Sequence, residues 1–257
     1  SEHWTNAGSL LGENAQVPTA GQLTAKTSEG YGEATLATAE RLVRVLANLT
    51  TYVPAMGGWE GPWNLDGDAT FLDIGSGYGK VVLHVKMMAG CRAVHGIECV
   101  PKRVEISTLA LQGSYGELDR ASLDDDLLRG CSFCCADATS CPPFEFSHVY
   151  TFDRVFSRHT FEARAGTATA HPRSHRSSSL RLLSSAVDLH LYPQALAKVL
   201  QRSPFYVMIS SKAPRVWWGY GLTKIQPVAK MRFKTTGREG CTVFIYVNTQ
   251  FIPGMVG

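Results

Sequence analysis

A glycine-punctuated stretch at residues 71–80 constrains the fold of this chain more than any other part of the sequence. It reads Phe-Leu-Asp-Ile-Gly-Ser-Gly-Tyr-Gly-Lys, so an apolar run around one acid leads into three glycines at alternate positions. A largely apolar run compatible with a helix, residues 81–88, follows at once. This order predicts a strand, a tight turn and the start of a helix.

The predicted turn is suited to bind a small molecule. Glycine adopts positive φ readily and lets a ligand approach the backbone closely. The start of the following helix offers unpaired N–H groups to such a ligand. We therefore expect a small molecule to lie above Gly75, Gly77 and Gly79. The alternative is a glycine turn that binds nothing, and the strand–turn–helix context argues against it.

The spacing of the glycines indicates which kind of ligand binds. A dinucleotide fingerprint reads G-x-G-x-x-G, whereas this chain has G-x-G-x-G with Asp73 two residues before the first glycine. An acid is unfavourable beside phosphates but suits a cationic ligand with an amino-acid tail, such as S-adenosylmethionine. A second acid, Glu98, lies 23 positions after Gly75 at the end of an apolar run. An acid at about 20 residues' distance can bind the hydroxyls of a ribose.

The rest of the chain alternates between strand and helix patterns. An amphipathic helix is expected near residues 36–49, followed by a connector at residues 50–67. Further strands are expected at residues 94–98, 131–135, 149–152 and 205–210, with helices at 101–111 and 191–201, an acidic surface segment at 117–129, and a closing antiparallel pair at 222–233 and 242–247. This alternation predicts an α/β fold with a doubly wound, mostly parallel sheet. Gly75, Glu98, Asp137 and Asp153 then all fall at carboxyl ends of strands, where ligands bind in such sheets.

Chain length, cysteines and hydropathy narrow the class of protein. The 257 residues suffice for one large α/β domain. The cysteines number seven, an odd count that fits a reducing compartment better than a disulfide scaffold. Cys131, Cys134, Cys135 and Cys141 invite a zinc interpretation, but there is no second C-x-x-C and no histidine at ligand spacing. We predict buried free cysteines and no metal. No apolar run approaches the roughly 18 residues of a membrane span, so no membrane association is expected.

Charge is distributed unevenly along the sequence. Residues 1–150 carry 10 Lys+Arg and 18 Asp+Glu, and residues 151–257 carry 15 Lys+Arg and 4 Asp+Glu. The basic C-terminal half predicts a polyanionic partner. We divide the chain into an N-terminal arm, helix and connector (1–67) and a core (68–257), with a basic, flexible insertion at 163–185. Arg164, Arg173, Arg176 and Arg181 lie in this insertion. A nucleic-acid contact and an inert loop are about equally good interpretations of it.

Four segments, in this order, resemble the Dot-one (disruptor of telomeric silencing) class of histone H3 lysine methyltransferases. They are Tyr-Gly-Glu-Ala-Thr at 31–35, the glycine stretch at 71–79, Gly-Ile-Glu at 96–98, and Ser-Ser-Lys-Ala-Pro at 210–214. The chain is most similar to the compact protozoan members of this class. The glycine stretch is shared with many class I methyltransferases, whereas the Tyr-Gly-Glu segment is more specific. The resemblance covers about residues 25–250, and it implies the class I S-adenosylmethionine-dependent methyltransferase fold.

The resemblance also implies a function and a set of site residues. Family members transfer methyl from S-adenosylmethionine to a lysine on the globular core of histone H3 within the nucleosome. By position, cofactor contacts are expected from Tyr31, Gly32, Glu33, Ala34, Thr35, Phe71, Leu72, Asp73, Ile74, Gly75, Ser76, Gly77, Tyr78, Gly79, Lys80, Glu98, Asp137, Ala138 and Asp153. Tyr31, Asp153 and Phe156 are expected at the catalytic centre. Histone H3, nucleosomal DNA bound by the basic half, and a nuclear location follow from the resemblance.

Two departures from the family pattern bear on the chemistry. Ala34 stands where the family has threonine, with Thr35 one place later, and Asp153 stands where the family has asparagine. The target lysine must lose its proton, and its free pKa is about 10.4. An apolar channel and a nearby sulfonium both lower that pKa, whereas a carboxylate at Asp153 favours the charged, unreactive form. We therefore expect Asp153 to make activity more dependent on pH than asparagine would.

The channel walls and the substrate class have alternatives. Tyr31, Phe152 and Phe156 are candidates for the channel, whereas strand alternation makes Phe233 and Phe244 better candidates for the core. A second functional interpretation is an RNA methyltransferase with the same cofactor site. A third is a non-catalytic chromatin-binding module with a vestigial pocket. Intact Asp73, the three glycines and Glu98 argue against the third.

Overall fold

The computed structural model describes residues 34–120, 125–152, 181–235 and 240–254. Its centre is one seven-stranded sheet with the strand order β3-β2-β1-β4-β5-β7-β6. The strands are β1 (Thr70–Ile74), β2 (Ala93–Glu98), β3 (Cys131–Cys135), β4 (His148–Thr151), β5 (Val207–Ser210), β6 (Ile225–Phe233) and β7 (Cys241–Asn248). Strands β1 to β5 pair in parallel, whereas β7 runs antiparallel to both β5 and β6. The predicted α/β fold, with a doubly wound, mostly parallel sheet and a closing antiparallel pair, is confirmed.

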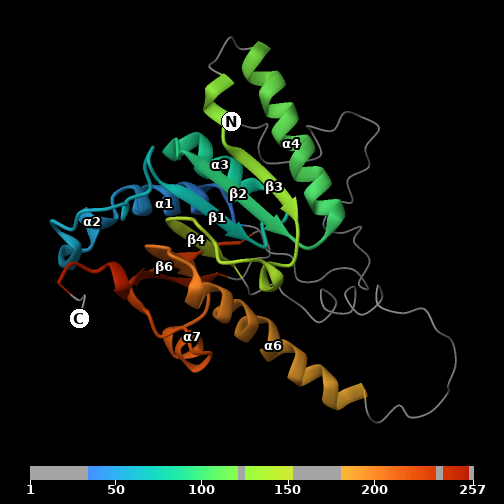
Figure 1. Ribbon diagram of the computed structural model, residues 1–257. Coiled ribbons are helices and arrows are strands. Elements are labelled where there is room, and N and C mark those ends of the chain that lie inside the picture. The colour runs from blue at the N-terminus through green and yellow to red at the C-terminus, as the bar shows by residue number, and fades with distance from the viewer. Residues whose placement is uncertain (1–33, 121–124, 153–180, 236–239, 255–257) are drawn as a thin grey trace, which may run out of the picture.

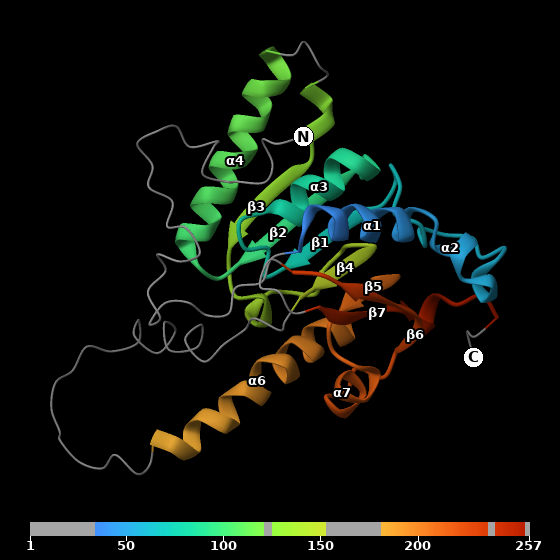
Figure 2. The same ribbon diagram turned by 180° about the vertical axis from the view of Figure 1, so that it is seen from behind.

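Helices cover both faces of the sheet, as a doubly wound fold requires. Figures 1 and 2 show α1 (Leu36–Ala47), α3 (Lys80–Ala89) and α4 (Pro101–Arg120) on one face, and α6 (Arg181–Arg202) and α7 (Pro214–Gly219) on the other. Short turns complete the described chain: α2 (Leu49–Tyr52), η2 (Pro54–Met56), η3 (Asp125–Leu128), η4 (Ala138–Ser140) and η6 (Thr249–Phe251). None of the described helices is long and apolar enough to span a membrane.

The core consists of two layers, because successive residues of a strand point to opposite faces. On β1, Phe71 packs with Leu42 and Leu46 of α1, and the adjacent Leu72 packs with Leu196 of α6 and with Trp217. All six side chains are fully buried. The described part of the N-terminal arm therefore packs on the same core as the sheet, and the division of the chain at residue 67 stays a prediction.

Several predicted element boundaries were wrong. Helix α4 continues to Arg120, into the segment predicted as acidic surface, and α6 begins at Arg181, so residues 181–185 are helical rather than part of an insertion. Strand β4 spans His148–Thr151 and ends one residue earlier than expected, and α7 was not predicted. The rest of the predicted insertion, residues 163–180, lies outside the described residues.

The prediction that the cysteines are buried was also wrong for most of them. Only Cys91 and Cys241 are buried among the seven free cysteines, whereas Cys99 and Cys135 are exposed and the remaining three are half-buried. The reason is that β3, which carries three of the cysteines, is the edge strand of the sheet.

Candidate functional site

The predicted glycine turn connects β1 to α3 at the carboxyl end of the sheet. Gly75, Gly77 and Gly79 have φ of +81°, +55° and +82°, values that side chains with a Cβ rarely adopt. Strand β1 ends at Ile74 and α3 begins at Lys80, so the three glycines form the whole reversal of direction together with the two residues between them. The strand, turn and helix predicted from the sequence are confirmed.

Four N–H groups of the turn donate to acceptors within the protein. Gly75 and Ser76 both donate to the carbonyl of Ile97, at 2.8 and 3.0 Å, and Gly79 donates to the carbonyl of Ser76 at 2.9 Å. Gly77 donates to Oε2 of Glu98 at 3.0 Å. All four N–H groups are therefore bonded within the protein, whereas the prediction that the helix start offers unpaired N–H groups to a ligand stays a prediction. Because these donors are already used, the turn is poorly equipped to bind a pyrophosphate, in agreement with the argument from Asp73.

Close packing gives a second reason for glycine at two positions. A Cβ on Gly79 would lie 2.6 Å from Cζ of Phe133, and a Cβ on Gly96 would lie 2.6 Å from Cδ1 of the same ring. Phe133 of β3 thus fills the space that these glycines leave beside the turn. The sequence analysis missed this contact, because nothing local to Phe133 indicates that its ring reaches a turn more than fifty residues away.

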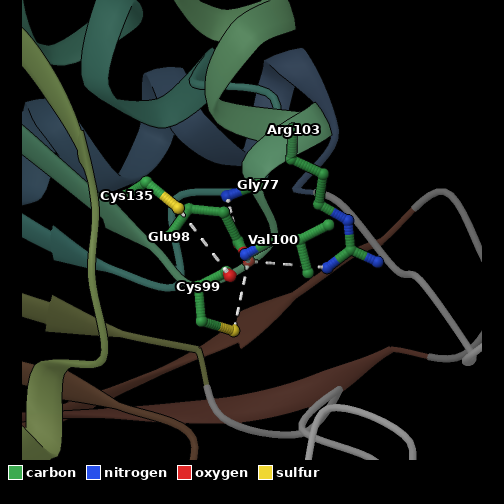
Figure 3. A network of polar contacts seen from close by, with 6 residues as sticks. All are labelled: Gly77, Glu98, Cys99, Val100, Arg103 and Cys135. Atoms are coloured by element: carbon green, nitrogen blue, oxygen red, sulfur yellow. Dashed lines mark hydrogen bonds and ion pairs between the residues drawn. The ribbon is translucent and has the colours of Figure 1, made fainter. Parts of the chain in front are cut away.

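Glu98, the last residue of β2, is held by several contacts beside the turn (Figure 3). Its Oε2 accepts from the N–H of Gly77 at 3.0 Å, and its Oε1 accepts from the N–H of Val100 at 2.9 Å. Nη1 of Arg103 lies 3.9 Å from Oε1, and the thiol of Cys99 donates to the same oxygen at 3.5 Å. Each carboxylate oxygen has about two lone-pair sites, and Oε2 accepts only the bond from Gly77 among the contacts described, so it can still accept a bond from a ligand.

Asp73 is a second buried carboxylate close to Glu98. Burial, and then the negative charge of Glu98, raise the pKa of Asp73 well above its usual range. Its Oδ1 is buried without a hydrogen-bond partner, and so are Oγ of Ser76 and Oγ1 of Thr151. Buried polar atoms in proteins are nearly always paired. These three atoms belong to residues at the carboxyl ends of β1 and β4, so they indicate a polar ligand at this edge, and the two acids favour a ligand that carries positive charge.

Asp137 already has a structural role within its own turn. Its Oδ1 accepts from the N–H of Thr139 at 3.0 Å, and its two carboxylate oxygens also accept from the hydroxyls of Thr139 and Ser140. It therefore caps η4, and Ala138 is buried beneath it. Asp followed two residues later by Thr is a turn signal that the sequence analysis did not use. A ligand at Asp137 would have to share a carboxylate that is already bonded.

Most of the other residues predicted for the site are buried in the core, attached to the end of β6, or outside the described residues. The side chains of Phe71 and Leu72 are buried in the core, as is that of Ile74. Ala34 forms a β-bridge with Thr235, and the N–H of Thr35 donates to the carbonyl of Lys234, so both are attached to the end of β6. Tyr31, Gly32, Glu33, Asp153 and Phe156 lie outside the described residues. The roles predicted for these side chains stay predictions.

Two aromatic side chains, Phe152 and Phe233, bear on the prediction of a lysine channel with aromatic walls. Phe152 is half-buried and stacks on Phe233, with ring centroids 5.2 Å apart. Phe233 is fully buried and also packs against Tyr150, so its preferred assignment to the core is confirmed.

Part of the chain matches the family model "Histone methylation protein DOT1", over residues 61–116. The matched segment contains Asp73, the glycine turn and Glu98. No curated protein matches the chain.

Several solved structures are distantly similar to this chain. TrmN from Thermus thermophilus is 14% identical with a TM-score of 0.45, and the match covers 80% of this chain and 48% of that one, so this chain spans about half of that protein's length. An RNA methyltransferase from Salinibacter ruber, in complex with S-adenosyl-L-homocysteine, is 14% identical with a TM-score of 0.44, covering 86% of this chain and 97% of that one. Likenesses this distant carry no argument about activity.

Proposed function

We propose that this protein transfers methyl from S-adenosylmethionine to a lysine on the globular core of histone H3 in nucleosomes. The fold class and the match to the DOT1 family model support S-adenosylmethionine-dependent methyl transfer as the reaction type. The single observation that carries the proposal is the site formed by Asp73, the glycine turn and Glu98. All of these residues lie within the segment that matches a histone methylation protein.

The residues present fit the proposed cofactor. S-adenosylmethionine supplies a methyl group already activated by a positively charged sulfur. The positive charges of its amino group and its sulfonium suit the two buried acids. Oδ1 of Asp73 is buried without a hydrogen-bond partner, so a donor on the ligand would satisfy it. Glu98 would accept from the ribose hydroxyls, and Gly77 and Val100 hold its carboxylate in place for this. Ala138 and the backbone of Asp137 would border the adenine.

The substrate end of the site rests on residues predicted from the sequence. Tyr31, Asp153 and Phe156 would surround the incoming lysine, which must be neutral to attack a methyl group. Desolvation by aromatic walls lowers the pKa of an amine, so Tyr31 and Phe156 would act chiefly by excluding water, whereas a carboxylate at Asp153 would favour the charged form of the lysine. No strong acid is required, because the leaving group is a neutral thioether.

A cationic surface supports a nucleosomal partner. Lys230, Arg232 and Lys234 lie on β6 or directly after it, and all three are exposed. Arg41 of α1 donates to the carbonyl of Arg232, and the exposed Arg44 lies one turn further along the same helix. We call these five residues the β6 cationic edge. It would contact the phosphates of nucleosomal DNA, and such a substrate implies a nuclear protein.

The cofactor assignment is tested by Glu98→Gln. Hydrogen bonds to a charged group contribute about 1.5–3 kcal/mol, so the variant should bind S-adenosylmethionine roughly 10- to 100-fold more weakly in calorimetric titration. Glu105→Gln is the matched control, because Glu105 is an exposed glutamate on α4 that pairs only with Lys102 among the contacts described. Equal affinities for the two variants would contradict the assignment.

The nucleosome contact is tested by the salt dependence of binding. Each phosphate contact contributes about 0.9 to the slope of log K against log salt, so Lys230→Glu with Arg232→Glu should lower that slope by about 2. Lys102→Glu with Arg92→Glu makes the same charge change on exposed residues near the opposite edge of the sheet and should leave the slope unchanged. An unchanged slope in the first variant would eliminate the β6 cationic edge as the contact.

A further inference from the structure

A histidine, a serine and a cysteine form a cluster on the face of β2 and β3 that is remote from the turn. Nδ1 of His95 lies 2.8 Å from Oγ of Ser132, and Nε2 lies 3.2 Å from Sγ of Cys134. Phe146 stacks on the imidazole, with ring centroids 6.1 Å apart and planes inclined by 17°. The imidazole is therefore fixed from three sides, with one nitrogen on a hydroxyl and the other on a thiol.

The topology leaves this cluster accessible. In most βαβ units a helix follows each strand, but the connection from β3 to β4, which the structure describes throughout, contains only the 3-10 turn η4. β3 is also the edge strand of the sheet (Figure 1). Cys134 is accordingly half-buried rather than enclosed.

The arrangement is that of an activated nucleophile. A thiol within hydrogen-bond reach of a base, with the base oriented by a third group, is the constellation used for nucleophilic catalysis. In the tautomer whose Nδ1–H donates to Ser132, Nε2 is free to accept the thiol proton. Burial raises the pKa of Cys134 and lowers the pKa of His95, so the resting pair is a neutral thiol and a neutral imidazole. The proton therefore moves only when an electrophile is attacked.

A second thiol, that of Cys141, packs against the same apolar cluster as Cys134. After burial, a negative charge on Cys141 also raises the pKa of Cys134. The thiol of Cys141 contacts the carbonyl of Asp137 at 3.5 Å. The segment between the two cysteines contains Cys135, the cap residue Asp137 and the whole of η4.

We propose that Cys134 is a hydroperoxide-reactive thiol, with His95 as its base, Ser132 as the residue that orients the base, and Cys141 as the resolving thiol. Sγ of Cys134 attacks the terminal peroxide oxygen, the O–O bond breaks, and the thiol proton passes through Nε2 to the departing oxygen, which leaves as water or an alcohol. The thiol of Cys141 then attacks the sulfenic acid and water leaves. Two thiols and one hydroperoxide give one disulfide, with two electrons passing from sulfur to oxygen.

The disulfide would alter the segment that borders the candidate cofactor site. It would join the end of β3 to the residue after η4 and so change the position of Asp137 and Ala138. The consequence for cofactor binding rests on the proposed function, whereas the thiol chemistry does not.

The first test is a competition within the unmodified full-length chain. The protein is exposed to limiting hydrogen peroxide, and the remaining free thiols are blocked with a first alkylating agent. Cysteines oxidised to sulfenic acid or disulfide are then reduced, labelled with a second agent and quantified by fragmentation mass spectrometry. General-base assistance contributes about 100-fold or more in favourable cases, so Cys134 should be labelled at least about tenfold faster than Cys99 and Cys135. Those two are the exposed thiols. Labelling that follows exposure, with Cys99 or Cys135 first, would overturn the proposal.

Variants test the individual roles. His95→Phe retains a flat ring against Phe146 but no base, and should lower the Cys134 rate at least about tenfold. His84→Phe replaces another half-buried histidine, on α3, and should leave that rate unchanged. Cys141→Ser should accumulate sulfenic acid and yield no disulfide at residue 134. A disulfide from Cys134 to another cysteine would refute the resolving role, and if His95→Phe fails to fold, the competition in the unmodified chain still decides.

A final measurement separates this inference from the proposed function. Affinity for S-adenosylmethionine is compared before and after peroxide treatment and again after reduction with dithiothreitol. Weaker binding that reduction restores supports the link to the cofactor site, and unchanged binding despite a Cys134–Cys141 disulfide refutes that link. If the fully reduced protein does not bind S-adenosylmethionine, the proposed function is contradicted, but a mapped Cys134–Cys141 disulfide still supports the thiol chemistry.

Discussion

Replacement of Gly79 by alanine should destabilise the protein for two separable reasons. The backbone there has φ of +82°, and the left-handed region costs a residue with a Cβ about 1–2 kcal/mol. The new methyl would also lie 2.6 Å from Cζ of Phe133 and 2.9 Å from Cβ of Ser107, and overpacking of this kind costs about 1–3 kcal/mol. We therefore expect a loss of roughly 2–5 kcal/mol, a large part of the stability of a domain.

Gly90→Ala provides the matched control. Gly90 has φ of +64°, at the C-terminal end of the same helix, and a Cβ there would meet nothing within 4 Å. The control should therefore show the conformational cost alone, about 1–2 kcal/mol. Urea unfolding, followed by the fluorescence of the buried Trp63 and Trp217, measures both variants.

A double-mutant cycle isolates the contact with the ring. Phe133→Leu shortens the side chain, so combined with Gly79→Ala it should recover about 1–2 kcal/mol relative to the sum of the single changes. If Gly79→Ala costs no more than Gly90→Ala, or if the cycle shows no coupling, Phe133 does not enforce glycine at this position and the packing argument fails.

Two further predictions concern buried ionisable groups. His148 is fully buried between Ser147 and the carbonyl of Trp63, and burial lowers its pKa to about 4. The unfolded chain takes up a proton at about pH 6.5, whereas the folded chain does so only near pH 4. The free energy of unfolding should therefore fall by about 3 kcal/mol between pH 6.5 and 4. Urea midpoints measured in this range should show a smaller loss for His148→Gln than for the unmodified protein. An equal loss in both proteins would assign the effect to other groups. The raised pKa of Asp73 means that its ionised form is unfavourable in the folded protein, so Asp73→Asn should raise the urea midpoint at pH 7 yet weaken binding of S-adenosylmethionine. A lower midpoint would show that the charged group stabilises the fold.

Local sequence signals were sufficient for most of the sheet. The apolar run before Gly75 and the glycines themselves combine two independent signals, hydrophobic periodicity and turn chemistry, and these located β1, the turn and α3 correctly. Glu98 was placed at the end of β2 because it ends an apolar run and lies 23 positions after Gly75. The antiparallel closing pair was also predicted, because both segments alternate and neither is followed by a helix pattern.

Features that depend on tertiary contacts were not predictable in this way. Phe133 reaches Gly79 and Gly96 only once three strands are in register, so no local pattern indicates it. The hydrogen bonds of the glycine turn have their acceptors, the carbonyl of Ile97 and the carboxylate of Glu98, on another strand, so no local pattern indicates these bonds. Helix α7 has six residues, too few for periodicity to show.

The interpretation of Asp137 shows a different limit. An acid after a strand could bind a ligand or cap a turn, and the sequence analysis weighed only the first. The structure reveals the cap, with two hydroxyls and an N–H on its carboxylate.

The most direct test of the central proposal is a methyl-transfer reaction with labelled S-adenosylmethionine. Nucleosomes, free histone H3 and RNA are offered side by side, and the labelled product is mapped by mass spectrometry. The proposal predicts label on a lysine in the globular core of H3, strongest with nucleosomes. Label on RNA would retain the fold and cofactor but reject the histone substrate, and absence of label from every substrate, by a protein that still binds the cofactor, would contradict the proposed activity.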